Sequence, residues 1–203
     1  MIKLLKRVIL CALIAAAFWT WNLVQDNRTL REELIRFHVI AASDSEEDQR
    51  IKLQVRDAVL ASISQDLAAI GDVELARDYI RENLPKIRQT ANAVLEALGY
   101  DQTASATFEE EVFGRRDYDT FSLPAGFYQS LKITLGEGAG QNWWCVAFPG
   151  LCLPAAGQGF EDVAAGAGFS DALTKTLSGE EDYEIRFFLL DLLGSWQGYF
   201  AGR

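Results

Sequence analysis

The residues of this chain best suited to chemistry are two cysteines close together in the sequence and one histidine far from them. Cys145 and Cys152 are separated by a stretch that allows the chain to turn at Pro149-Gly150 and bring the two sulfurs within bonding distance. The sequence therefore predicts a disulfide between them if the compartment is oxidising. The alternative is a Cys145 nucleophile with His38, the one histidine of the chain, as its general base.

Two tryptophans directly precede Cys145 and offer a surface for recognition. Successive side chains of a strand leave on opposite faces, so either one of Trp143 and Trp144 faces outward or a second layer covers it. Aromatic residues are enriched at the centres of binding interfaces. Trp143, Trp144 and Phe148 therefore form a candidate partner-binding surface, and the alternative is that both tryptophans belong to the core.

Other chemistries have weaker support. Two cysteines and one remote histidine fall short of a tetrahedral zinc site. The run 44–49 resembles the start of a calcium loop, but Gln49 stands where the turn glycine is required and Val55 where the closing glutamate is required. Glu109–Glu111 is interpreted as a solvated strand edge, and the glycines of 136–140 as turn residues. We expect no metal, no cofactor and no catalytic residue, and hence no enzyme.

The hydrophobic pattern predicts an α+β fold. Alternation places strands near 34–41, 104–113, 127–135 and 143–148, with the last two joined as a hairpin. We expect a small, mostly antiparallel sheet packed against helices from the N-terminal half, plus a C-terminal helix after residue 180, for which a strand at Tyr183–Leu190 is the alternative. The strand at 34–41 is predicted to be half-buried, with Arg36 and His38 on its outer face.

Two helical regions follow the first strand. Ser43 and Glu46 form a predicted capping pair, and the apolar residues recur every fourth position: Ile51, Val55, Val59, Ile63 and Leu67. The second region runs from about 73 to 98, and Pro85 predicts two helices or a kink there. Its expected buried residues are Leu75, Tyr79, Ile80, Ile87, Val94, Leu95 and Leu98.

The N-terminus predicts export. Lys3, Lys6 and Arg7 precede the apolar run Val8–Phe18, as in a secretory signal, with a possible cleavage site after Ala17. Residues 1–24 are thus a signal peptide or an uncleaved signal anchor. Residues 28–203 are predicted to form a single extracytoplasmic domain, with 155–180 as a flexible loop. The formal net charge of −10 argues against a nucleic-acid partner.

Two blocks of the sequence resemble the stage II sporulation protein R family. The first runs from Phe37–Ala41 through Ser43–Gln49 to Lys52 and Val55–Val59. The second comprises Leu123–Gly126 with Tyr128, then Gly140–Val146, then Phe148-Pro149 through Leu151-Cys152. The resemblance covers about Leu34 to Pro154 and departs at Ala42 and Gly150, where the family usually has Asn and Pro.

The resemblance implies a secreted signalling protein of endospore-forming bacteria. Such a protein is exported into the intermembrane space between forespore and mother cell. There it is needed to activate a membrane-embedded aspartic-type protease, its implied partner, which cleaves a sigma-factor precursor. Two alternatives remain open: an exported hydrolase that uses Cys145 or carboxylates, and a structural adaptor anchored by an uncleaved Val8–Val24 helix.

Overall fold

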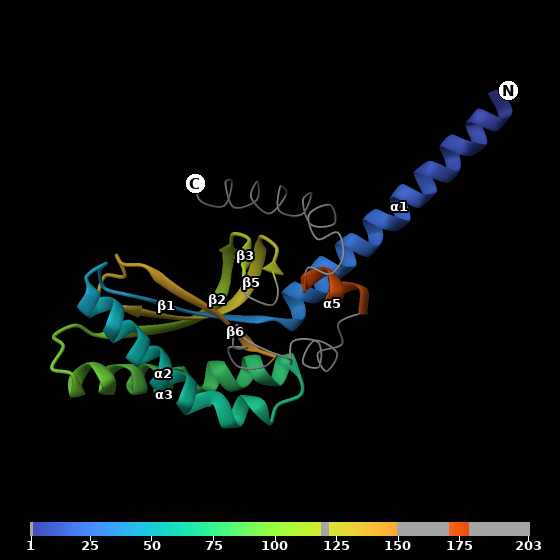
Figure 1. The fold of residues 1–203 in the computed structure, drawn as a ribbon. Coiled ribbons are helices and arrows are strands. Elements are labelled where there is room, and N and C mark those ends of the chain that lie inside the picture. Colours follow the sequence, from blue (N-terminus) through green and yellow to red (C-terminus); the bar gives the residue numbers. More distant parts are fainter. Residues whose placement is uncertain (1, 119–121, 150–170, 179–203) are drawn as a thin grey trace.

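The structure is a computed structural model that describes residues 2–118, 122–149 and 171–178 (Figure 1). Its elements in chain order are α1 (Ile2–Glu33), β1 (Ile35–Ile40), α2 (Glu46–Ala68), α3 (Val73–Ala97), β2 (Ala104–Phe113), β3 (Arg116–Asp117), β4 (Ser122–Leu123), β5 (Gly126–Leu135), β6 (Asn142–Phe148) and α5 (Asp171–Leu177). The predicted α+β class is confirmed: α2 and α3 cover one face of a four-stranded sheet (Figure 1).

The sheet has the strand order β2-β5-β1-β6. β1 pairs in parallel with β5 and antiparallel with β6, while β2 pairs antiparallel with β5, so the sheet is mostly antiparallel as predicted. The predicted hairpin of 127–135 with 143–148 is wrong, because β1 lies between these two strands. The connection 136–141 therefore crosses over the end of β1, where the Gly140 N–H donates to the Ala41 carbonyl over 2.9 Å.

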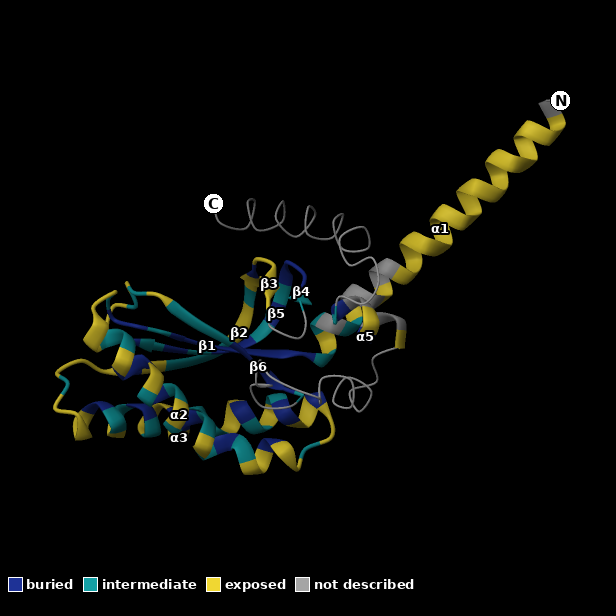
Figure 2. Cartoon of the chain, viewed as in Figure 1, coloured by how far each residue is buried: buried dark blue, intermediate teal, exposed yellow. Residues whose placement is uncertain are grey.

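β1 is buried on both faces, which corrects the half-buried strand expected from its alternation (Figure 2). Phe37 and Val39 face the helices and belong to the main hydrophobic core. Arg36 and His38 are also buried, at 0% and 4% exposure, on the opposite face. A second layer of side chains therefore covers the face on which the sequence pattern had placed solvent.

The helices supply the main core as the four-residue period predicts. All five stripe residues of α2 are buried. α3 is one helix with Pro85 inside it, so the expectation of two helices is wrong; its buried residues are Val73, Ala76, Ile80, Ile87, Ala91 and Leu95. Leu75 and Leu98 were expected to be buried, but they are 60% and 39% exposed.

The start of α2 uses a different cap from the one predicted. Ser45 is the N-cap residue, and its hydroxyl accepts the Asp48 N–H over 3.1 Å. Ser43 instead donates its hydroxyl to the Asp48 carboxylate over 2.5 Å, and Tyr100 donates to the same carboxylate over 2.6 Å. These hydrogen bonds lower the pKa of Asp48. The acidic run therefore forms the start of α2, where negative charge is favourable.

The remaining predictions concern the two ends of the chain. α1 leads into β1 with Leu34 between them, and most of its side chains are exposed (Figure 2). α5 occupies 171–177, inside the stretch predicted as a flexible loop. The rest of that stretch before 171, and the predicted C-terminal helix, lie outside the described residues.

Candidate functional site

The face of the sheet opposite the helices carries a cluster of charged and aromatic side chains. We call it the outer-face cluster and define it by Arg36, His38, Glu111, Phe113, Tyr118, Tyr128, Lys132 and Trp144. β1, β2, β5 and β6 each contribute at least one member. Alternation along the four strands brings their members of the cluster to the same face, and Tyr118, which follows β3, joins them through Arg36.

His38 and Glu111 form the polar centre of this cluster. His38 Nε2 lies 2.8 Å from Glu111 Oε2, and Lys132 donates to the other carboxylate oxygen. Burial raises the pKa of Glu111, but the hydrogen bonds from His38 and Lys132 outweigh burial and lower it to about 2. An ionised carboxylate only accepts hydrogen bonds, so His38 Nε2 carries the proton. Glu111 therefore satisfies one ring nitrogen of His38, while Nδ1 is buried and has no hydrogen-bond partner among the described residues.

Arg36 is held mainly by aromatic rings. Its guanidinium carbon lies 4.4 Å from the Phe113 ring centre and 5.2 Å from that of Tyr128, and Nη2 donates to Tyr118 Oη over 2.9 Å. Nε and Nη1 are buried and have no hydrogen-bond partner among the described residues. Burial lowers the pKa of Arg36. Cation–π contacts thus stabilise a charge that has no carboxylate partner in the described ranges.

The two tryptophans lie on opposite faces of β6, and both are partly buried. Trp143 makes an edge contact with Phe37 on the helix side, with ring centres 6.0 Å apart. Trp144 stacks on His38 on the other side, with centres 4.7 Å apart and an angle of 2°. Phe148, the third predicted contact residue, is 6% exposed and part of the main core, so its side chain is not available to a partner in this arrangement.

The structure separates the predicted nucleophile from its base. Cys145 pairs with Phe37 in the β1–β6 ladder and belongs to the helix-side core, whereas His38 points into the outer-face cluster. The sheet therefore lies between them, and the Cys145/His38 dyad does not form. Cys152 lies outside the described residues, so its bond to Cys145 stays a prediction. Within the described ranges no group of three or more potential metal ligands comes together.

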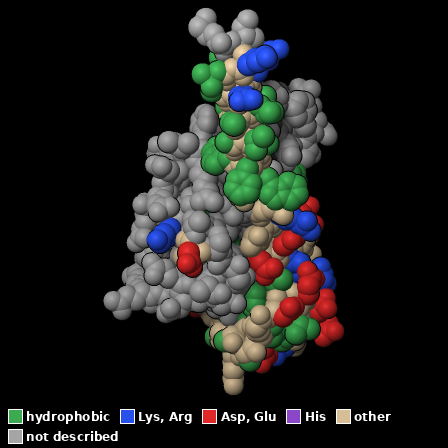
Figure 3. Space-filling view, turned by 90° about the vertical axis from the view of Figure 1, so that its right-hand side faces the viewer, with side chains coloured by type: hydrophobic (Ala, Val, Ile, Leu, Met, Phe, Trp, Pro, Cys, Tyr) green, Lys and Arg blue, Asp and Glu red, His purple; other side chains and the backbone are tan. Residues whose placement is uncertain are grey.

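α1 is apolar along most of its length and is anchored to the domain at its C-terminal end. Lys3–Asn22 is long and apolar enough to cross a membrane by length and composition, as a signal sequence also is, and none of it is buried. Figure 3 shows its apolar side chains projecting from the body, with acidic side chains further down the same face.

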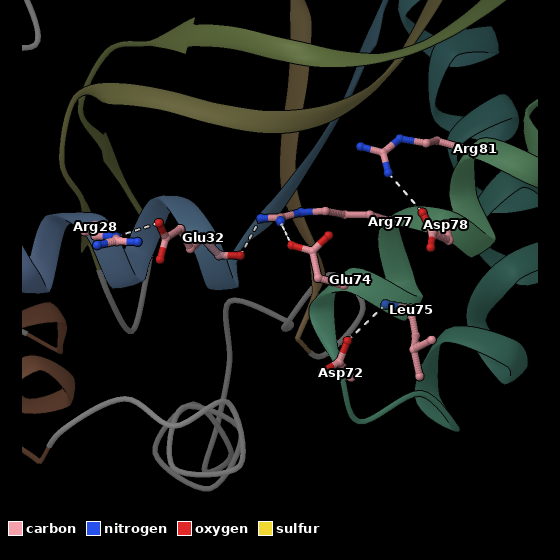
Figure 4. A network of polar contacts seen from close by, with 8 residues as sticks. All are labelled: Arg28, Glu32, Asp72, Glu74, Leu75, Arg77, Asp78 and Arg81. Carbon is pink, nitrogen blue, oxygen red and sulfur yellow. Dashed lines mark hydrogen bonds and ion pairs between the residues drawn. The ribbon is translucent and has the colours of Figure 1, made fainter.

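Polar contacts join the end of α1 to the rest of the chain (Figure 4). Arg77 of α3 donates to the Glu32 carbonyl and pairs with Glu74. Arg31 donates to the Phe127 carbonyl of β5 over 3.2 Å. The last turn of α1 is therefore fixed to both α3 and the sheet.

The sequence pattern of Stage II sporulation protein R (spore_II_R) matches residues 31–158, which is more than half of the chain. The chain belongs to the stage II sporulation protein R family. The family match begins in the last turn of α1 and includes the whole sheet.

A curated relative gives the same family assignment. The chain is 41% identical over 122 residues to Stage II sporulation protein R of Bacillus subtilis (strain 168), and the alignment covers 60% of the chain and 54% of that protein. The chain thus spans about half the length of the curated relative it matches. No solved structure matches it.

The two blocks that carried the family resemblance meet in the fold. Phe37–Ala41 includes most of β1, and the second block includes β6, its antiparallel neighbour. Beyond the strands, the Gln141 N–H donates to Asp44 over 2.8 Å, and Lys52 donates to the Gln141 carbonyl over 3.1 Å. The family signature therefore marks the junction between the sheet and the start of α2.

Sequence reasoning missed most of the outer-face cluster. Arg36, Glu111 and Lys132 looked like ordinary solvated positions on alternating strands. A signal becomes readable only once the strand order is known, because β1 then places Arg36 and His38 on the same face as Trp144 and Phe113. Large aromatic residues on the presumed solvent face of neighbouring strands indicate a second layer.

Proposed function

We propose that this chain is an exported sporulation signalling protein that triggers a membrane-embedded protease to process a sigma-factor precursor during endospore formation. It would act in the intermembrane space between forespore and mother cell, as a protein ligand and not as an enzyme. Membership of the stage II sporulation protein R family over residues 31–158 is the observation that carries the proposal.

The N-terminal helix supports export. Lys3, Lys6 and Arg7 precede the apolar part of α1, the order that directs the following segment outward. Because the last turn of α1 is fixed to α3 and β5, a chain that keeps this helix would hold its domain next to the outer surface of the membrane. N-terminal sequencing of the exported protein distinguishes the two forms: a start at Phe18 means a released ligand, and a start at Met1 means an anchored one.

The arrangement of the candidate nucleophile favours a ligand over a thiol hydrolase. A Cys–His mechanism needs the two side chains within hydrogen-bond reach, and here the sheet separates Cys145 from His38. No observation in the described residues favours a carboxylate-dependent hydrolase over the signalling role.

We propose the exposed part of the Trp143-Trp144 segment as the contact surface. Both side chains are only partly buried, and each has a guanidinium beside its ring: Arg56 lies 4.6 Å from the Trp143 ring centre, and Arg116 lies 4.6 Å from that of Trp144. A partly exposed aromatic residue flanked by arginine is the composition typical of interface centres.

We also propose the Cys145–Cys152 disulfide, which would fix the chain after β6 to the sheet. Intact mass measurement after alkylation of the native exported protein, with and without reductant, tests this bond. Two alkylated thiols at these positions without reductant would exclude it.

The functional test is co-expression of the full chain with the protease and its precursor substrate. Cleavage of the precursor should appear only when all three are present. A Cys145→Ser variant that folds normally without the disulfide should still support cleavage, since the sulfur is not a nucleophile in this proposal. Cleavage by the chain in the absence of the protease would refute the proposal, as would cleavage that is the same without the chain.

A further inference from the structure

The two edges of the sheet differ in charge. β2 forms one edge and carries Glu109–Glu111. β6, the orange strand in Figure 1, forms the other edge among the described strands and has no charged residue from Asn142 to Phe148. Charged edge strands discourage pairing with further strands, whereas an uncharged edge permits it. β6 is therefore the edge at which an additional strand can pair.

The ladder between β1 and β6 defines which backbone groups of β6 point away from the sheet. The Ala41 N–H donates to the Gln141 carbonyl over 3.4 Å, so this carbonyl faces β1 as it does in the hydrogen-bonded pairs of a ladder, although the Gln141 N–H donates to Asp44 instead. Such pairs alternate with non-bonded pairs in an antiparallel ladder. Continuing the printed register, the N–H and C=O groups of Asn142, Trp144 and Val146 turn outward. No backbone hydrogen bond from these outward groups to another described element is present.

Positive charge flanks this edge on both faces. Arg56 of α2 lies over Trp143 on the helix side, and it also pairs with Asp57 over 2.7 Å. Arg116 of β3 lies over Trp144 on the other side; it is exposed and has no ion pair with a described residue. In a chain of net charge −10, this is a local positive rim along an uncharged strand edge. It would attract an acidic partner.

We infer that β6 binds its protein partner by strand addition, and that the added strand is an extended segment of the partner that carries acidic residues. The inference rests on the proposed function, which supplies the partner, and it names the structure that the partner's contact segment must adopt. Backbone hydrogen bonds would give affinity, while Arg116 would select acidic side chains. A second copy of this chain is a poorer occupant, because β6 paired with itself would bring one Arg116 near another.

The first pair of variants separates the effect of the backbone N–H of residue 142 from that of its side chain. Asn142→Pro removes an outward N–H at the first residue of β6, a place where an edge strand tolerates proline without losing a bond to β1. Asn142→Ala removes the same side chain but keeps the N–H, so it is the matched control. Both would be tested as full chains co-expressed with the protease and its precursor. We expect Asn142→Pro to reduce cleavage about tenfold and Asn142→Ala to leave it close to wild type.

A second pair of variants tests the role of positive charge at the β6 edge. It also keeps the inference testable if the proline variant does not fold. Arg116→Glu reverses the charge beside Trp144. Arg88→Glu makes the same charge change at an exposed position of α3, which packs against β2 at the opposite edge of the sheet. We expect about a tenfold loss of cleavage for Arg116→Glu only. Hydrogen exchange of the wild-type complex should in turn show slowed amides at Asn142, Trp144 and Val146.

The outcomes separate the two proposals. If the wild-type chain does not promote cleavage, the proposed function is refuted, and the partner with it. If the wild-type chain promotes cleavage but folded Asn142→Pro and Arg116→Glu do so equally well, strand addition alone is refuted. Protection of the β2 edge or of the helices, with β6 amides unchanged, would also overturn it.

Discussion

Replacing Glu111 by glutamine should destabilise the fold and remove part of its acid sensitivity. The Glu111 carboxylate accepts hydrogen bonds from both His38 and Lys132 inside the outer-face cluster. Burial raises its pKa, but these two partners bring the pKa down from 4.5 to about 2. Glutamine keeps the shape of the side chain but not its charge. In the variant, Lys132 is left with Glu109 as its carboxylate partner.

The size and the sign of the effect follow from this pKa. Because the folded value lies below the unfolded value, the ionised carboxylate stabilises the fold above pH 4.5, and this stabilisation is lost as the pH falls from 4.5 to about 2. The full shift corresponds to at most about 3–4 kcal/mol. Since 21% of the Glu111 side chain is exposed, solvent weakens the interaction, and we expect Glu111→Gln to cost about 1–2 kcal/mol near neutral pH.

Chemical denaturation of the full chain in mild detergent, followed by tryptophan fluorescence, measures this cost near neutral pH and in acid. Glu109→Gln is the matched control, because Glu109 also binds Lys132 but is 52% exposed, and it should change stability by less than about 0.5 kcal/mol. The wild-type chain should lose more stability in acid than Glu111→Gln does. Equal stability of the two glutamine variants near neutral pH would refute this role of Glu111, as would an equal loss of stability by Glu111→Gln and wild type in acid.

Two further predictions concern β6 and the connection before it. Trp143→Ala and Trp144→Ala, made singly, should each leave a folded chain that no longer supports precursor cleavage. Thermal unfolding and the cleavage assay together test this expectation. Unfolding of both variants would mean that the two rings serve only the core. Gly140→Ala should cost about 1–3 kcal/mol, because the added methyl group would collide with the Ser43 carbonyl. Gly71→Ala, where nothing lies within 4 Å of the added carbon, is its control in the same denaturation assay, and equal effects would contradict the clash.

The helices and strands whose apolar residues recur at one regular spacing could be predicted from the sequence. The stripe from Ile51 to Leu67 recurs every fourth residue, and each member is buried as expected. The positions of the four strands were also recognisable from alternation. In α3 the apolar positions continue on both sides of Pro85, at Ile80 and Ile87, and packing of both into the core keeps one helix where a local rule predicts a break.

The sheet order and the outer layer could not be predicted, because both depend on contacts between residues distant in sequence. The glycine-rich connection 136–141 is short enough for a hairpin, and nothing local reveals that β1 lies between the strands it joins. Arg36 has the charge of a surface residue, and only Phe113, Tyr118 and Tyr128 make its burial tolerable. Likewise, the sequence indicated a role for both tryptophans, but only the structure shows that Trp143 contacts Phe37 on one face and Trp144 stacks on His38 on the other.

The central place of β1 has a consequence for the order in which an exported chain can fold. β1 follows α1 almost directly, yet its two neighbours β5 and β6 come roughly a hundred residues later. If the chain is threaded through a membrane from its N-terminal end, β1 emerges early and must remain unpaired while α2, α3 and β2 are still in transit. The sheet then closes in one late event, after residue 148 has crossed. A chain exported only as far as β5 would therefore still lack β6 and the edge of the sheet that β6 forms.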